Sequence, residues 1–192
     1  MKKFLKPLAV LACTVALVAG TVAATLAFLT DKTNSITNTF VAGDISITLT
    51  ETAVEEFKMV PGTDIAKDPK VTVEAGSEAC WLFVKLDKSP NFDTYLTYAI
   101  VDGADGWETL DAENGIYYRY VEATTKDTTF QVLAGNVVKA KPEVTKEQYN
   151  SINANNLTLI VTAYAIQHAG FETTGDAKPT AAWDKILASS QS

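Results

Sequence analysis

Histidine and cysteine are the residue types whose spacing most directly indicates catalysis or metal binding, and this chain has few of them. His168 is its only histidine, and Cys80 is one of two cysteines. A catalytic zinc needs several protein ligands, and no His-Glu-x-x-His motif is present. The apolar neighbours of Cys80, residues 81–83, would raise the pKa of its thiol and make it a poor nucleophile. We therefore predict no enzyme activity, no cofactor and no metal, with His168 on the surface at a strand end and Cys80 buried.

A second chemical candidate is the acidic loop at residues 102–108. It gathers the carboxylates of Asp102, Asp105 and Glu108 around two glycines. The spacing differs from that of an EF-hand loop, and the ligands are fewer than calcium usually takes. Because Asp-Gly pairs commonly form turns, we predict a solvated turn, with calcium binding as the alternative.

An aromatic strip at residues 117–120 is the candidate binding surface. Successive side chains of a strand point to opposite faces, so Tyr118 and Tyr120 share one face, while Tyr117 and Arg119 share the other. Packing on the sheet is the simpler interpretation. Aromatic rings also suit contacts with carbohydrate or a protein partner, which makes Tyr118 and Tyr120 the possible partner surface.

Strand patterns dominate the elements that must position these residues. Residues 44–50 alternate between apolar and hydroxyl side chains, which predicts a half-buried strand. Residues 79–86 are apolar on both faces, as expected of a central strand, with Cys80 on the inward face. The long β-branched and aromatic run at 156–167 predicts another central strand. Further strands are predicted at residues 71–74, 95–101, 115–121 and 128–133.

Two short helices interrupt the strands. Thr145 and Gln148 have capping-box spacing at the start of a helix predicted to end near Ile152. A second predicted helix, residues 179–188, begins at a proline and places Trp183, Ile186 and Leu187 on one side. Short strands without regular βαβ alternation predict a mainly β protein, an antiparallel jelly-roll-like β-sandwich with one or two short helices.

The N-terminus has the pattern of a secretory signal peptide. Three lysines among the first six residues precede an almost uncharged run at residues 7–29. Small side chains at Thr25 and Ala27 suit a signal peptidase, which predicts cleavage between Ala27 and Phe28. Cleavage after Ala24 is the alternative.

Two other interpretations of this N-terminal segment remain. The apolar run is long enough to span a bilayer as an anchor, but it ends in small residues rather than basic ones. The residues before Cys13 resemble a lipoprotein box, although too few residues separate them from the last of the lysines to form an ordinary hydrophobic region.

Export would leave a strongly acidic domain. Removing residues 1–27 takes away three of 16 basic side chains and none of 23 acidic ones, so 13 remain against 23, a net charge near −10. Such a surface does not suit nucleic acid or anionic lipid. A single cysteine is left, so no intramolecular disulfide can form, and stability must come from packing and sheet pairing.

Two N-terminal segments carry a family resemblance. Residues 20–32 run through the predicted cleavage site into a polar Thr-Asp-Lys stretch, and residues 38–45 read Asn-Thr-Phe-Val-Ala-Gly-Asp-Ile. In order and spacing they resemble the TasA and camelysin (CalY) family of Gram-positive bacteria. The resemblance is specific over residues 20–49 and weaker at 60–63 and 158–167.

The resemblance implies a jelly-roll subunit of extracellular biofilm-matrix fibres, or a cell-surface protein of that general kind. It also implies processing by a dedicated signal peptidase. Camelysin relatives have been labelled metalloproteases, but His168 stands alone, so metalloprotease activity is the least favoured function.

From these patterns we predict three parts: a signal peptide at residues 1–27, an N-terminal arm at 28–40 and a β-sandwich domain at 41–192. The middle of the arm is polar, while Phe28, Ile36 and Phe40 share one face of an extended strand. The arm is therefore a candidate donor strand that completes a sheet edge on a second copy of the chain.

The predicted partners follow from that arm. Copies of the chain would form a fibre, and other matrix or cell-surface proteins are further candidates. The alternative function is a monomeric cell-surface adhesin or binding module that uses Tyr118 and Tyr120.

Overall fold

The computed structural model describes residues 38–40, 44–52, 60–104, 106–145, 147–148, 157–171 and 177–189. All of these belong to one compact unit, Ile36–Ser192. The predicted signal peptide and its cleavage site between Ala27 and Phe28 lie outside the described residues, as does Ile36. No helix within the described ranges is long and apolar enough to cross a membrane.

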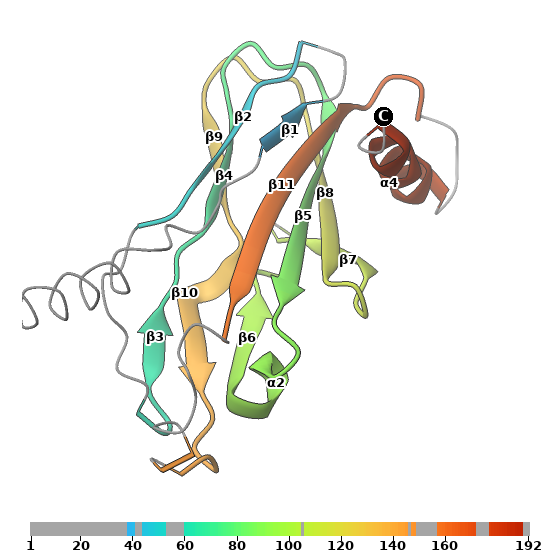
Figure 1. Ribbon diagram of the computed structural model, residues 1–192. Helices are drawn as coiled ribbons and strands as arrows, with labels where there is room; N and C mark the ends of the chain where they lie inside the picture. The colour runs from blue at the N-terminus through green and yellow to red at the C-terminus, as the bar shows by residue number, and fades with distance from the viewer. Residues whose placement is uncertain are drawn as a thin grey trace, which may run out of the picture. The chain divides into compact units, whose positions relative to one another are not determined.

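A five-stranded sheet in the order β1-β11-β5-β8-β7 forms the first layer (Figure 1). Its strands are β1 (Asn38–Phe40), β5 (Cys80–Lys88), β7 (Glu108–Asp111), β8 (Ile116–Val121) and β11 (Leu159–Gln167). β11 pairs with β5 in antiparallel fashion at nine positions. The two strands have the long apolar runs of the sequence, so they lie where both faces are covered. β1 is parallel to β11, and the other pairs of this sheet are antiparallel.

Two three-stranded antiparallel sheets, β2-β4-β9 and β3-β10-β6, form the second layer. Their strands are β2 (Ile47–Thr50), β3 (Asp64–Ala66), β4 (Lys70–Val73), β6 (Leu96–Ile100), β9 (Thr128–Gln131) and β10 (Leu133–Ala140). β10 contains a register shift between Leu133 and Val138, where Gly135 and Asn136 have φ angles of 67° and 55°. Glycine and asparagine tolerate this left-handed region, so the strand bends there.

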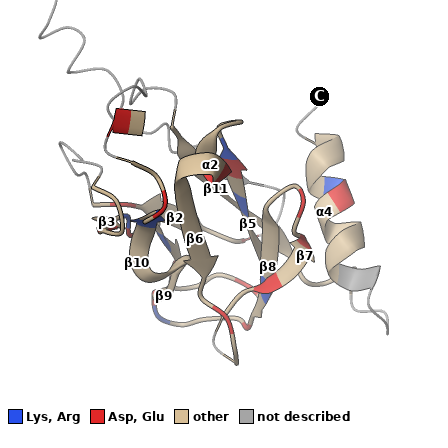
Figure 2. Ribbon diagram, turned by 90° about the horizontal axis from the view of Figure 1, so that it is seen from below, with Lys and Arg blue, Asp and Glu red and all other residues tan. Residues whose placement is uncertain are grey.

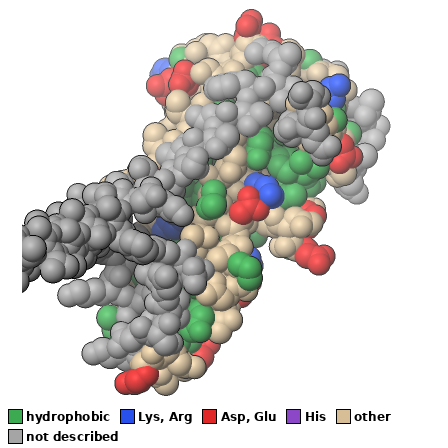
Figure 3. Space-filling model, viewed as in Figure 1, with side chains coloured by type: hydrophobic (Ala, Val, Ile, Leu, Met, Phe, Trp, Pro, Cys, Tyr) green, Lys and Arg blue, Asp and Glu red, His purple; other side chains and the backbone are tan. Residues whose placement is uncertain are grey.

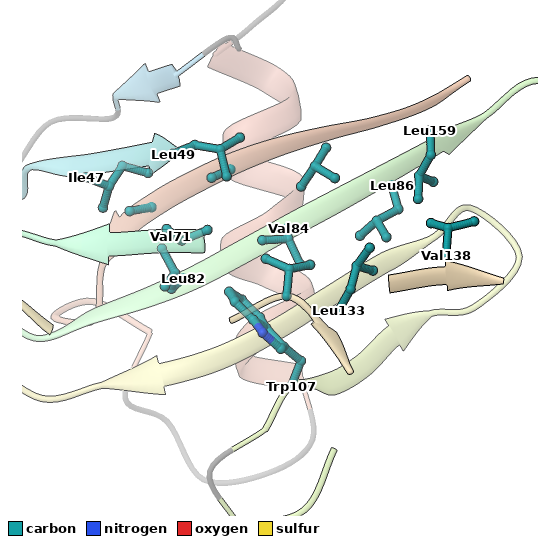
Figure 4. Close-up of a cluster of buried hydrophobic side chains, with 14 of the residues drawn as sticks. Ile47, Leu49, Val71, Leu82, Val84, Leu86, Trp107, Leu133, Val138 and Leu159 are labelled. Carbon is teal, nitrogen blue, oxygen red and sulfur yellow. The ribbon is translucent and has the colours of Figure 1, made fainter. Parts of the chain in front are cut away.

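The inner face of β5 lies in the core between the layers. Figure 4 shows apolar side chains from both layers pointing toward one another around it. Cys80 is fully buried on this face together with Leu82, Val84 and Leu86, which confirms the predicted inward face. The core also contains Ile47, Leu49, Val71, Leu133, Val138 and Leu159.

The outer face of β5 is covered by helix α4 (Ala177–Ser189), close to the predicted span. Trp183 and Ile186 are buried against this face, but Leu187 is 43% exposed. The prediction that placed Leu187 on the apolar side is wrong, because Ala182, Trp183 and Ile186 form the buried side and Leu187 is turned away from its centre. Figure 3 shows hydrophobic side chains gathered over the sheet next to this helix.

The sequence prediction of a mainly β, jelly-roll-like sandwich with one or two short helices is confirmed at the level of layers and elements. The capping box is also confirmed, since the Thr145 backbone N–H donates to Gln148 Oε1 at 2.8 Å and the Gln148 N–H donates to Thr145 Oγ1 at 3.2 Å. The remainder of that predicted helix lies outside the described residues. Helix α2 (Phe92–Tyr95) was not predicted, nor were strands β3 and β7, and the predicted strand at 128–133 reaches only the first residue of β10.

Candidate functional site

The edge of β11 is the first candidate site. β1 pairs with it in parallel register, Asn38 with Ala163 and Phe40 with Ala165. β11 spans nine residues, and within the described part of the chain β1 pairs with three of them, Ala163–Ala165. The last residues of the predicted arm therefore form a strand of their own domain, at the edge of the sheet as far as the structure describes it.

The composition of β11 distinguishes this edge from the opposite edge of the same sheet. β11 contains no charged residue, whereas β7 has Glu108 and Asp111 among its four. Figure 2 shows the acidic colour on β7. Charged side chains on an edge strand discourage pairing with another strand. The β11 edge is therefore the better suited of the two to accept a further strand.

The two faces of β11 are packed differently where β1 pairs with it. Ala163 and Ala165 point into the core and are 0% and 3% exposed. Between them, Tyr164 points outward, and its ring centroid lies 5.2 Å from that of Trp183 in α4. At these positions helix α4 therefore packs against the outer face of β11, while the inner-face side chains of β11 are small.

An aromatic cluster of Trp81, Tyr118, Tyr120 and His168 is the second candidate site. The ring centroids of Tyr118 and Tyr120 each lie 5.7 Å from that of Trp81, which confirms that the two tyrosines share a face. The Tyr118 hydroxyl donates to Glu108 Oε2 at 2.6 Å. Tyr120 is 44% exposed, so it is the most accessible tyrosine of this cluster.

His168 belongs to this cluster, which the sequence did not indicate. It follows β11 as predicted, but it is half-buried, and its ring centroid lies 4.7 Å from that of Tyr120 and 5.3 Å from that of Trp81. The reason is a backbone hydrogen bond from the His168 N–H to the Ala79 carbonyl at 2.8 Å, which places the turn beside β5.

The two chemical candidates of the sequence are not brought together. Burial raises the pKa of the Cys80 thiol to about 12, so the thiolate needed for nucleophilic attack does not form near neutral pH. Cys80 points into the core, while His168 lies among the outer-face aromatic side chains.

The acidic loop makes a turn in which the Gly106 N–H donates to the Gly103 carbonyl at 3.0 Å. Among the residues that the structure describes, no three His, Cys, Asp or Glu side chains are grouped to hold a metal ion. Asp105 lies outside those residues, so the calcium alternative for this loop stays untested.

No protein-family model matches the sequence, and neither a curated protein nor a solved structure is significantly similar to it.

Proposed function

We propose that the protein is a secreted structural subunit that self-assembles into extracellular biofilm-matrix fibres by exchanging its N-terminal arm between copies. The observation that carries this proposal is the parallel pairing of Asn38–Phe40 with Ala163–Ala165, three of the nine residues of β11. The same pairing formed with the β11 of a second copy would be a head-to-tail contact. Head-to-tail contacts propagate into filaments unless they close into a ring.

Exchange has a physical advantage over pairing within one chain. The described residues pair with β11 at three positions, and the predicted arm, residues 28–40, is long enough to pair along all nine residues of that strand. Each added hydrogen bond is worth about 0.5–1.5 kcal/mol. A strand pairs with its own domain at an effective concentration in the millimolar range, which favours pairing within one chain. The free energy of several added hydrogen bonds can offset this advantage.

The chemistry of the domain is in keeping with a structural role. Cys80 and His168 do not form a catalytic pair of nucleophile and base, because the Cys80 thiol is buried and the His168 ring packs against aromatic side chains. The resemblance of residues 20–49 to the TasA and camelysin family favours the same function. Signal peptidase is the partner expected during export, and other matrix or surface proteins are the further partners.

Negative-stain microscopy of the purified mature protein tests the proposal. We expect fibres from the wild-type protein. Deletion of residues 28–38 should leave a protein that caps full-length fibres without forming its own. Fibres from the deleted protein at the wild-type concentration would contradict an arm-exchange mechanism.

The aromatic cluster supports a second candidate function, that of a cell-surface binding module. Tyr120 is exposed beside His168, and such rings can stack on sugars or on a protein partner. Affinity electrophoresis of wild type and Tyr120→Ala in gels containing cell-wall polysaccharide tests this function. Wild-type retardation that the variant loses, together with a persistent monomer in microscopy, would favour this second function.

A further inference from the structure

We propose that the aromatic cluster of Trp81, Tyr118, Tyr120 and His168 binds a neutral, β-linked pyranose glycan. The Tyr120 ring stacks on the sugar, and the Trp81 indole N–H donates to one of the sugar oxygens. This inference rests on the second candidate function, whose ligand class it names. It does not depend on whether the chain also forms fibres.

The Tyr120 ring is the contact surface for the sugar. Tyr120 is 44% exposed, and the ring centroids of Trp81 and His168 lie 5.7 Å and 4.7 Å from its own. The interplanar angles are 65° and 61°, so both neighbours support the ring by edge-to-face contacts, a favoured arrangement of aromatic pairs. A β-linked pyranose with equatorial hydroxyls suits the exposed part of this ring, because its axial C–H groups form an apolar face.

Trp81 supplies a hydrogen-bond donor that lacks an acceptor. Its side chain is buried, and no partner for its Nε1 atom exists in the part of the chain that the structure describes. A buried unpaired donor is unfavourable and is commonly satisfied by a water or a ligand. An indole N–H can only donate, so the ligand must contribute an acceptor oxygen.

A sugar oxygen reaches Nε1 only when a neighbouring ring moves, since the atom is covered. Tyr120 contacts Trp81 and has nearly half its surface exposed, so it has the freedom to turn. Side-chain rotamer changes of this kind are common when a ligand or partner binds.

The charges around the cluster select a neutral ligand. Glu108 accepts a hydrogen bond from the Tyr118 hydroxyl at 2.6 Å, and Glu78 accepts one from Gln167 at the end of β11. These carboxylates and the net charge of −7 repel a polyanion. A simple cation such as an alkylammonium brings no acceptor for Trp81, and both carboxylates already have hydrogen-bond partners.

Isothermal titration calorimetry with matched polymers tests the ligand class. Hydroxyethyl cellulose and carboxymethyl cellulose share a β-linked glucan backbone, but only the second is anionic. We expect the protein to bind hydroxyethyl cellulose or an N-acetylchitooligosaccharide, and to bind carboxymethyl cellulose at least about tenfold more weakly. The two neutral probes distinguish a plain glucan from an N-acetylated glycan of the cell-wall type. Binding of neither neutral probe would overturn the inference.

Two variants and a control assign the contact to Tyr120. Tyr120→Ala should lose at least about tenfold in affinity for the neutral probe, whereas Tyr120→Phe should retain it because phenylalanine keeps the ring. Ile160→Ala is the matched control, since Ile160 is 40% exposed on the same face at the other end of β11. Circular dichroism checks that each variant is folded. Equal affinity of wild type and Tyr120→Ala would contradict the assignment.

Nuclear magnetic resonance of the wild-type protein tests the role of Trp81. The indole N–H resonance of Trp81 should shift as the neutral probe is added, while those of Trp107 and Trp183 stay in place. An unmoved Trp81 resonance at saturation would overturn the proposed hydrogen bond. Failure of the inference is separate from failure of the second function, because Tyr120-dependent binding confined to an anionic cell-wall polysaccharide would leave a binding module and overturn only the neutral ligand.

Discussion

The guanidinium carbon of Arg119 lies 3.8 Å from the ring centroid of Phe130, and 5.7 Å from that of Trp107. Arg119 is in β8 of the five-stranded sheet, and Phe130 is in β9 of the second layer. The cation therefore joins the two layers of the sandwich. Trp107 is fixed beside it, since its indole N–H donates to the Gln131 carbonyl at 2.8 Å.

Replacing Arg119 should weaken this connection. We expect Arg119→Met to lower the free energy of unfolding by about 1 kcal/mol, because methionine keeps part of the apolar stem but loses the cation above the rings. Urea denaturation monitored by tryptophan fluorescence measures the change. Lys126→Met removes an exposed charge and should stay within about 0.5 kcal/mol of wild type. An equal effect of the two substitutions would contradict the role of the ring contact.

Trp183 should be the most sensitive position of α4. It is 6% exposed, and its ring centroid lies 5.3 Å from that of Phe83. Trp183→Ala should destabilise the domain by about 3–5 kcal/mol through the cavity it leaves. Leu187→Ala, on the exposed side of the helix, is the matched control and should cost far less. Thermal denaturation of both variants checks the difference, and similar melting temperatures would show that α4 does not pack as described.

The buried thiol of Cys80 predicts a loss of stability at high pH. Burial raises its pKa from an ordinary 9.0 to about 12. Below pH 9 both the folded and unfolded states keep the proton, so the thiol adds no pH dependence. Between pH 9 and 12 only the unfolded state loses the proton, and this favours unfolding.

Urea denaturation of wild type and Cys80→Ala at pH 8 and pH 11 isolates this effect. The free energy of unfolding should fall more steeply with pH in wild type than in the variant. Burial also raises the pKa of Tyr98, but that contribution is common to both proteins and cancels in the comparison. Parallel pH profiles would contradict the prediction.

Fibre assembly should depend on salt. Copies with a net charge near −10 repel one another, and the screening length falls from about 30 Å at 0.01 M salt to about 10 Å at 0.1 M. We therefore expect faster sedimentation of fibres at the higher salt concentration. Sucrose, which does not screen charge, serves as the control solute, and assembly that slows with added salt would refute this expectation.

Much of the fold could be predicted because the spacing of apolar residues and the composition of a short segment indicate its secondary structure. The alternation of residues 44–50 and the apolar run at 79–86 correspond to β2 and β5, and the inward face of Cys80 follows from the alternation of strand side chains. β3 and β7 were not predicted because they are short and polar, so pairing with β10 and β8 defines them more than their own pattern does. Most of β10 was missed because Gly135 and Asn136 interrupt its apolar alternation.

The sequence by itself determined the mainly β class, the acidic charge, the absence of a histidine pair and the common face of Tyr118 and Tyr120. These properties depend on composition and on neighbours along the chain. Only the tertiary structure decided that Asn38–Phe40 lies beside Ala163–Ala165 and that His168 lies over Trp81. Such contacts join residues far apart in the sequence, and their geometry depends on how whole strands pair and layers pack, which no local pattern encodes.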